Sequence, residues 1–188
     1  MVNILLVSHS HKLAQGTAEL VRQMAPSPDL KIRVAAGIGD DHNDIGTDAV
    51  EIMEALSELA EGSDVLVLMD LGSAVLSTEM ALQMLDESIT ARVRMCPAPF
   101  VEGAIAAGVQ ANAGSSIEEV YDEAIHALAA KQQQIIGDQL VQPMAPAMEN
   151  VVETESNHIA EDAELLVTVT NPSGLHARPA ATFIQTVK

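Results

Sequence analysis

The chain has 188 residues and a formal net charge of -18, with 27 acidic residues against 9 basic ones. Such a surface repels nucleic acid phosphates and anionic membranes, so we expect neither as a partner. Hydrophobic residues make up 48% of the chain and aromatic residues 2%, so the core must be aliphatic, which suits a parallel sheet covered by helices.

Cys96 is the single cysteine and lies at the end of an apolar run. A lone thiol supports neither a disulfide framework nor a metal site, and it is typical of a reducing compartment. The first apolar run is too short for a signal or membrane helix, and no basic leader precedes it. We therefore expect a cytoplasmic protein.

Apolar periodicity predicts the elements of the first third of the chain. Residues 2–7 are an apolar run typical of a buried strand, and the chain then turns through SHSH at 8–11. Apolar residues recur at helical spacing over 13–24, and residues 30–36 alternate like a strand at a sheet edge. The run at 65–69 is the most hydrophobic in the chain and predicts a central strand.

The remaining elements complete a repeating strand and helix order. A helix is predicted between the second and third strands, another follows the third strand, and a fourth strand spans 93–96. Further helices are predicted over 101–113 and over 117–136. This order with short connections predicts an α/β three-layer sandwich with a mostly parallel sheet. Strand order 2-1-3-4 would bring the ends of the first and third strands together.

His9 ends the first strand and Asp70 ends the third, so the two side chains would meet across one crevice. A carboxylate bonded to one ring nitrogen fixes the tautomer and leaves the other nitrogen free to attack. Backbone N–H groups near Ser10, with those of Gly72 and Ser73, would hold phosphoryl oxygens. We expect His9 to carry a phosphoryl group without a metal; from position alone, an exposed residue in a helix cap is an equal alternative.

The other histidines give weaker signals. His11 is the rival for the phosphoryl group, but we expect it to point towards solvent. His42 and His126 are also expected to face solvent, and the acidic loop at 40–44 is better explained as solvated than as a cation site. No group of residues has metal-ligand spacing.

Three other protein classes fit less well. A flavodoxin-like FMN binder shares the strand order but needs aromatic residues that the chain lacks. An aspartyl-phosphate receiver needs carboxylates after the first strand, where this chain has SHS. A structural or interaction module without phosphorylation remains an alternative.

The last 52 residues divide into two parts. Residues 137–163 are acidic, contain prolines and lack periodicity, which predicts a flexible linker. Residues 164–188 predict a strand, a turn and a helix, with His176 and Arg178 forming a compact phosphate site at the helix start. This part is shorter than the ~40 residues that a domain usually needs, so we expect the opening of a second domain.

Several motifs carry a resemblance to known families. NPSGLHARPAA at 171–181 resembles the active-site signature of HPr, the histidine phosphocarrier of the phosphoenolpyruvate phosphotransferase system. Residues 1–136 resemble the mannose-type enzyme IIA domain through VSHS at 7–10, MDLGSA at 69–74 and PFVEGA at 99–104. Within that family, DLGSA in place of a DLFGG-like motif and the fusion to HPr resemble subunit M of phosphoenolpyruvate-dependent dihydroxyacetone kinases. An enzyme IIA component of a sugar-transport phosphotransferase system is the alternative.

The resemblance implies a phosphotransferase subunit. His9 would take a phosphoryl group from phospho-HPr, or from the chain's own HPr domain, and pass it to ADP on an L subunit, and the ATP formed would serve dihydroxyacetone bound on a K subunit. The chain itself would bind no cofactor, and the enzyme IIA domain would form a homodimer. His176 and Arg178 match the HPr motif, but the HPr-like segment looks incomplete, so a separate phospho-HPr is expected as donor.

Overall fold

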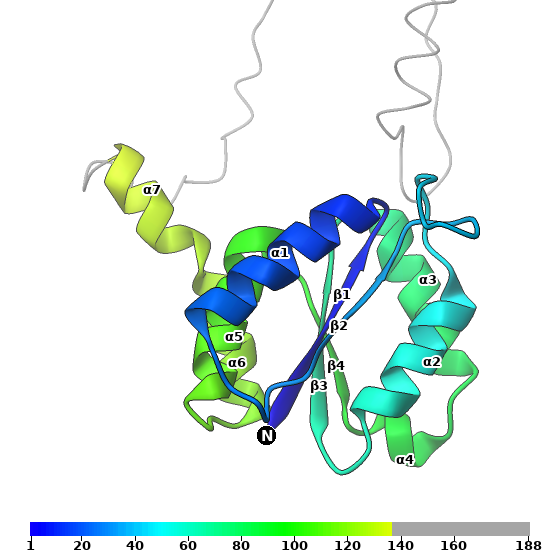
Figure 1. Ribbon diagram of the computed structural model, residues 1–188. Helices are drawn as coiled ribbons and strands as arrows, with labels where there is room; N and C mark the ends of the chain where they lie inside the picture. The colour runs from blue at the N-terminus through cyan, green and yellow to red at the C-terminus, as the bar shows by residue number, and fades with distance from the viewer. Residues whose placement is uncertain (137–188) are drawn as a thin grey trace, which may run out of the picture. The chain divides into compact units, whose positions relative to one another are not determined.

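Four parallel strands form one sheet in the order β2-β1-β3-β4 (Figure 1). The computed structural model describes residues 1–136; the predicted linker and the HPr-like segment with His176 and Arg178 lie outside the described residues. The strands are β1 Val2–Ser8, β2 Ile32–Ala36, β3 Asp64–Met69 and β4 Val93–Cys96. The predicted fold class is confirmed, and the strand order is the 2-1-3-4 order that was considered from the sequence.

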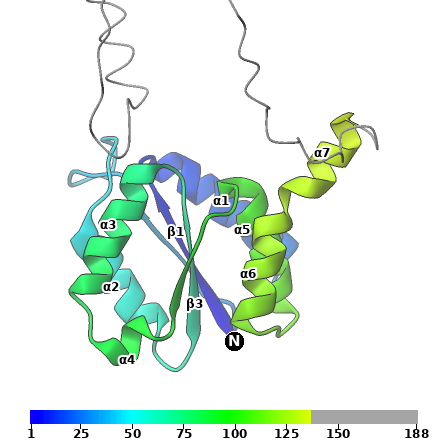
Figure 2. The same ribbon diagram turned by 180° about the vertical axis from the view of Figure 1, so that it is seen from behind.

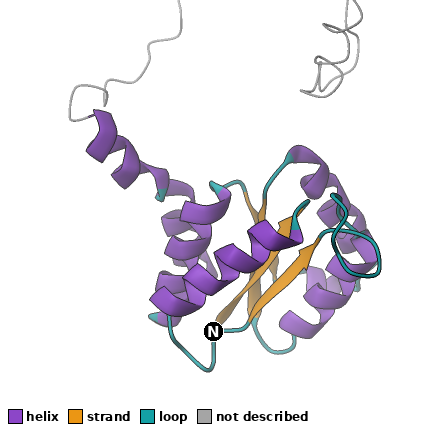
Figure 3. Ribbon diagram, turned by 45° about the horizontal axis from the view of Figure 1, so that its top comes forward, coloured by secondary structure: helices purple, strands orange, loops and turns teal. Residues whose placement is uncertain are grey.

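Helices cover both faces of the sheet, as the views in Figures 2 and 3 show. One hydrophobic core forms between the sheet and α1, α5 and α6, and a second forms between the sheet and α2 and α3. The helices are α1 His11–Met24, α2 Ala49–Leu59, α3 Gly72–Gln83, α4 Glu87–Thr90, α5 Phe100–Asn112, α6 Ile117–His126 and α7 Leu128–Ile136. None of the described helices is long and apolar enough to cross a membrane.

The central strand β1 supplies both cores because its side chains alternate between the two faces. Ile4 and Leu6 are buried against α1 and α5, whereas Leu5 and Val7 are buried on the opposite face. Burying an aliphatic side chain of this size contributes about 1.5–3 kcal/mol to stability. These residues can therefore stabilise both cores without large aromatic side chains. The fully buried core residues are almost all aliphatic, as composition predicts, and Phe100 and Tyr121 are partly buried against one core.

Two local features differ from the prediction. The single helix expected over 117–136 is two helices, because Ala127 donates to the carbonyl of Ala124, three residues back, instead of continuing the four-residue pattern. The four-residue helix α4 was not predicted, and it is too short to leave a periodic signal.

The sheet brings two strand ends and two helix starts to one edge. β1 and β3 are paired up to Val7 and Met69, and the N–H of Asp70 donates to the Val7 carbonyl at 3.2 Å. α1 begins two residues after His9, and α3 begins two residues after Asp70. Polar residues that follow these strands are thereby placed beside free helix N–H groups.

Candidate functional site: a histidine and a carboxylate between two strand ends

His9 and Asp70 are in direct contact at the carboxyl edge of the sheet. The His9 Nδ1 atom lies 2.9 Å from Asp70 Oδ1, and only 18% of the His9 side chain and 10% of the Asp70 side chain are exposed. A carboxylate accepts, so this contact places the hydrogen of a neutral imidazole on Nδ1. The lone pair is then on Nε2, the nitrogen turned away from Asp70.

Asp70 is held by four donors. Its Oδ1 receives the His9 ring and the Leu71 N–H at 2.7 Å, and its Oδ2 receives the Ser8 hydroxyl and the His9 N–H, each at 2.9 Å. Burial raises the pKa of Asp70, but the hydrogen bonds from His9 and Ser8 outweigh burial and the net pKa is lowered. The carboxylate is therefore ionised and fixed in orientation at neutral pH.

The free nitrogen of His9 faces the start of α3. Ser73 Oγ lies 2.7 Å from Nε2, so its hydroxyl can donate to the lone pair there. The N-cap residue Leu71 provides no side-chain acceptor for the first-turn N–H groups, which include those of Gly72 and Ser73. Open N–H groups at the positive end of a helix favour an anion, so this end of the ring is suited to a phosphoryl group.

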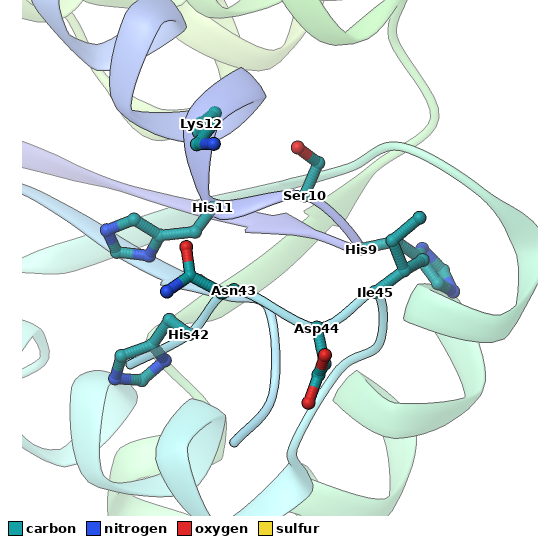
Figure 4. Close-up of a pocket in the computed structure, with 8 residues that line it drawn as sticks. All are labelled: His9, Ser10, His11, Lys12, His42, Asn43, Asp44 and Ile45. Atoms are coloured by element: carbon teal, nitrogen blue, oxygen red, sulfur yellow. The ribbon is translucent and has the colours of Figure 1, made fainter. Parts of the chain in front are cut away.

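Ser10, the other expected phosphate ligand, is used differently. Its hydroxyl accepts from the N–H of Leu13 at 3.3 Å and caps α1, and its own N–H donates to Ser8 Oγ at 3.1 Å. Figure 4 shows the Ser10 hydroxyl and the His9 ring pointing in different directions. The structure thus groups Asp70 and Ser73 around the His9 ring, whereas Ser10 shapes the turn.

The expectation that His11 points towards solvent is wrong, whereas His42 keeps 41% of its side chain exposed. His11 Nδ1 contacts the carbonyl of Ala36 at 3.1 Å, its Nε2 contacts Gln15, and its ring stacks on His42 with centroids 5.2 Å apart. Both residues are half-buried because the loop at 37–48 folds back over the start of α1. His126 is exposed, as predicted.

This loop also contacts His9, a role that was not predicted from the sequence. The N–H of Gly46 donates to the His9 carbonyl at 3.0 Å, and Thr47 Oγ1 lies 2.7 Å from Ser77 Oγ on α3. Gly37 has φ 76°, and a Cβ there would collide with the His42 carbonyl. The glycines of GIG at 37–39 and GTD at 46–48 were the available sequence signal, because glycine permits such a close approach.

A small hollow lies beside the His9 backbone, between the start of α1 and the loop (Figure 4). Its lining residues are His9, Ser10, His11, Lys12, His42, Asn43, Asp44 and Ile45. The described residues contain no group of three or more His, Cys, Asp or Glu side chains arranged to hold a metal ion. Among these residues, the group suited to a reaction is the oriented imidazole of His9.

Two protein-family models match the chain. The first, described as PTS system fructose IIA component, matches residues 3–121 and so contains the whole His9 site. The second, described as PTS HPr component phosphorylation site, matches residues 163–188, which include His176 and Arg178.

The curated relatives carry a consistent name. The phosphoryl donor subunit DhaM of the phosphoenolpyruvate-dependent dihydroxyacetone kinase of Escherichia coli strain K12 is 45% identical, over 100% of this chain and 38% of that protein. The DhaM subunit of dihydroxyacetone kinase 2 of Listeria innocua is 34% identical, over 65% of this chain and 96% of that protein. The chain therefore spans less than two-fifths of the E. coli relative but nearly all of the shorter Listeria one.

A solved crystal structure shares the fold. It is described as a protein of unknown function, is 34% identical, has a TM-score of 0.61, and covers 66% of this chain and 93% of its own. The match extends over about the length of the described enzyme IIA-like region.

Proposed function

The chain belongs to the PTS system fructose IIA component family, and from this premise we propose that it is the phosphohistidine carrier of a phosphoenolpyruvate-dependent dihydroxyacetone kinase. One observation carries the proposal: Asp70 holds Nδ1 of His9, while Nε2 faces Ser73 and the start of α3. Relatives named as phosphoryl donor subunits of such kinases support the choice of pathway.

In the first step, His9 Nε2 attacks the phosphorus atom of a phosphohistidine on the donor. The new N–P bond forms as the donor's N–P bond breaks, and the donor imidazole leaves with the bonding electron pair. The His9 ring becomes cationic in character, and the carboxylate of Asp70, 2.9 Å from Nδ1, stabilises that charge. The Ser73 hydroxyl then turns from Nε2 to a phosphoryl oxygen, beside the N–H groups of α3.

In the second step, an oxygen of the terminal phosphate of ADP attacks the same phosphorus atom and the His9 N–P bond breaks. The ADP belongs to the L subunit, and the ATP formed there phosphorylates dihydroxyacetone on the K subunit. The chain itself binds no nucleotide or metal in this scheme, acts in the cytoplasm and pairs as a homodimer. The donor is phospho-HPr or an HPr domain of the kind that the segment 163–188 matches.

Labelling from radioactive phosphoenolpyruvate, with enzyme I and HPr, tests the carrier role. Trypsin cleavage after Lys12 gives a peptide 1–12 with His9, whereas His176 lies in a peptide that begins after Lys131. We expect acid-labile, base-stable label on peptide 1–12, whether or not His176 is also labelled. A chain without label on that peptide would favour the structural or interaction class.

The acceptor separates the two pathway assignments. One sample of the labelled chain is mixed with an ADP-loaded L subunit, and a second sample is mixed with a IIB domain of a mannose-type sugar permease. Release of label to ADP only in the presence of the L subunit is expected. If the IIB domain drains the label while the L subunit does not, the chain is a component of a sugar-transport system instead.

A further inference from the structure

Ser8 is the last residue of β1, and its side chain is fully buried beside the His9 site. A buried hydroxyl must be satisfied by hydrogen bonds, and Ser8 Oγ lies 2.9 Å from Asp70 Oδ2. We propose that Ser8 is a positioning residue for phosphotransfer, acting through Asp70 to hold the His9 ring. The proposal rests on the carrier function proposed above and adds a residue to it.

The direction of the hydrogen bond follows from the partners of Ser8. The N–H of Ser10 donates to Ser8 Oγ at 3.1 Å, so the hydroxyl oxygen already accepts. Its single hydrogen has two possible acceptors, the Ser10 carbonyl at 3.2 Å and the Asp70 carboxylate at 2.9 Å. The ionised and nearer acceptor takes it, because hydrogen bonds to a charged group are the stronger ones.

Ser8 also differs from the other donors to Asp70. Two of the four donors are backbone N–H groups, of His9 and Leu71, and a third is the His9 ring itself. Four donors fill the four lone-pair positions of a carboxylate, so each oxygen has two partners and the plane of the group is fixed. Ser8 is the one donor whose side chain can be changed without altering the nucleophile.

Loss of the Ser8 hydroxyl would release one edge of the carboxylate. Oδ2 would keep only the His9 N–H, and the group could rotate about its bond to the chain. The contact between Oδ1 and His9 Nδ1 would then lose its fixed geometry, and with it the tautomer that leaves Nε2 free to attack. Access of phospho-HPr to His9 would be unchanged, because Ser8 is fully buried.

The test compares Ser8→Ala with Ser8→Thr, which keeps the hydroxyl and suits a strand. Ser57→Ala is the matched control, since Ser57 Oγ bonds to the Met53 carbonyl within α2, away from the site. We expect Ser8→Ala to slow phosphotransfer about tenfold at saturating phospho-HPr, by analogy with the lower end of the range for loss of the outer hydrogen-bond partner of a metal-bound histidine. The phospho-HPr concentration for half-maximal rate should stay unchanged, and Ser8→Thr should restore most of the rate.

Nuclear magnetic resonance of the His9 ring gives a readout that needs no phosphotransfer. The Nδ1–H signal of His9 should be observed in the wild type and in Ser57→Ala, and should broaden or vanish in Ser8→Ala. A Ser8→Ala chain that keeps both the wild-type rate and the wild-type signal overturns the proposal. A loss of rate with an unchanged Nδ1–H signal also overturns it, because Ser8 would then act elsewhere.

The Nδ1–H signal also distinguishes failure of the carrier function from failure of the positioning role of Ser8. If the wild type takes no label but Ser8→Ala still loses the Nδ1–H signal, the carrier function fails while the positioning role of Ser8 stands.

Discussion

Two pairs of a histidine and a carboxyl group lie on either side of the SHSH turn at 8–11, and the distances within the two pairs differ. On the α3 side, His9 Nδ1 lies 2.9 Å from Asp70. On the α2 side, His42 Nδ1 lies 3.7 Å from Glu51 Oε2, is buried, and has no hydrogen-bond partner among the described residues. The first pair is within hydrogen-bond distance, whereas 3.7 Å is too long for a hydrogen bond.

The carboxyl groups respond in opposite directions. Burial raises the pKa of Glu51 and the nearby His42 lowers it only partly, so the net pKa is raised. Asp70 is also buried, but the donors around it reverse the effect of burial and its net pKa is lowered. A nearby histidine is therefore not enough to lower the pKa of a buried carboxyl group, whereas hydrogen-bond donors that fix the carboxylate are.

The largest difference is expected in phosphate labelling when His9 and His11, the two histidines of the turn, are replaced one at a time. His11 represents the α2 side because its ring stacks on His42. His9→Ala should reduce label on peptide 1–12 by at least about a hundredfold, because the nucleophile is gone. His11→Ala should leave labelling within about threefold, since its ring bonds to the Ala36 carbonyl and not to a carboxylate. Circular dichroism spectra of both variants check that the fold is intact. Labelling that survives His9→Ala and disappears with His11→Ala would reverse the assignment of the two sides.

The two carboxylates should differ next. Asp70→Asn should slow phosphotransfer about a hundredfold, because a neutral amide no longer enforces the His9 tautomer or stabilises the cationic ring. Glu51→Gln should change the rate by less than about twofold, because Glu51 does not hold a ring nitrogen at hydrogen-bond distance. Initial rates with phospho-HPr measure both. Equal losses in the two variants would show that net negative charge, and not geometry, supports the reaction.

The fold was predictable because its signals are local and repeated. Apolar runs at 2–7 and 65–69, an alternating segment at 30–36 and a short segment at 93–96 predicted the strands, and the last agrees with β4. The alternation of strands and helices with short connections then predicted a parallel sheet with helices on both faces. The break at Ala127 was not predictable, because one backbone hydrogen bond decides it.

The site was predictable only where topology determines it. Asp70 was placed near His9 from strand order alone, and the structure brings the two side chains into contact. The Ser8 contact depends on the orientation of one hydroxyl, and the Gly46 contact joins two backbones 37 positions apart. The Ser8 contact leaves no residue-type pattern, and the glycines of the loop indicate a close approach without indicating its partner. The half-buried state of His11 likewise depends on how a distant loop folds over it.

A smaller effect is expected on stability and its pH dependence. The pKa of Asp70 is lowered in the folded chain, so its carboxylate stabilises the fold above the ordinary carboxyl range and loses that effect as the pH falls through the lowered pKa. Asp70→Asn should lower the free energy of unfolding by about 2 kcal/mol at pH 7, and by less at pH 3, because buried donors lose a charged acceptor.

Glu51 should show the opposite sign. Its pKa is raised, so the folded chain binds a proton more readily than the unfolded chain and gains stability as the pH falls towards the ordinary value of 4.5. Glu51→Gln should therefore not lower stability at pH 7. Urea unfolding at pH 7 and pH 3, followed by circular dichroism, measures both variants. An Asp70→Asn loss of equal size at the two pH values would contradict the carboxylate account.

The smallest effect is expected at His42, which has φ 53°. Asn adopts this left-handed backbone region readily, whereas a β-branched residue does not. His42→Asn also removes the buried Nδ1 atom, so we expect the free energy of unfolding to change by less than about 0.5 kcal/mol. His42→Val, which also removes the ring, should cost about 1–3 kcal/mol through backbone strain. A loss above about 1 kcal/mol in His42→Asn would mean that the stack on His11 or the approach to Glu51 stabilises the loop, and the two sides would then be more alike than their distances indicate.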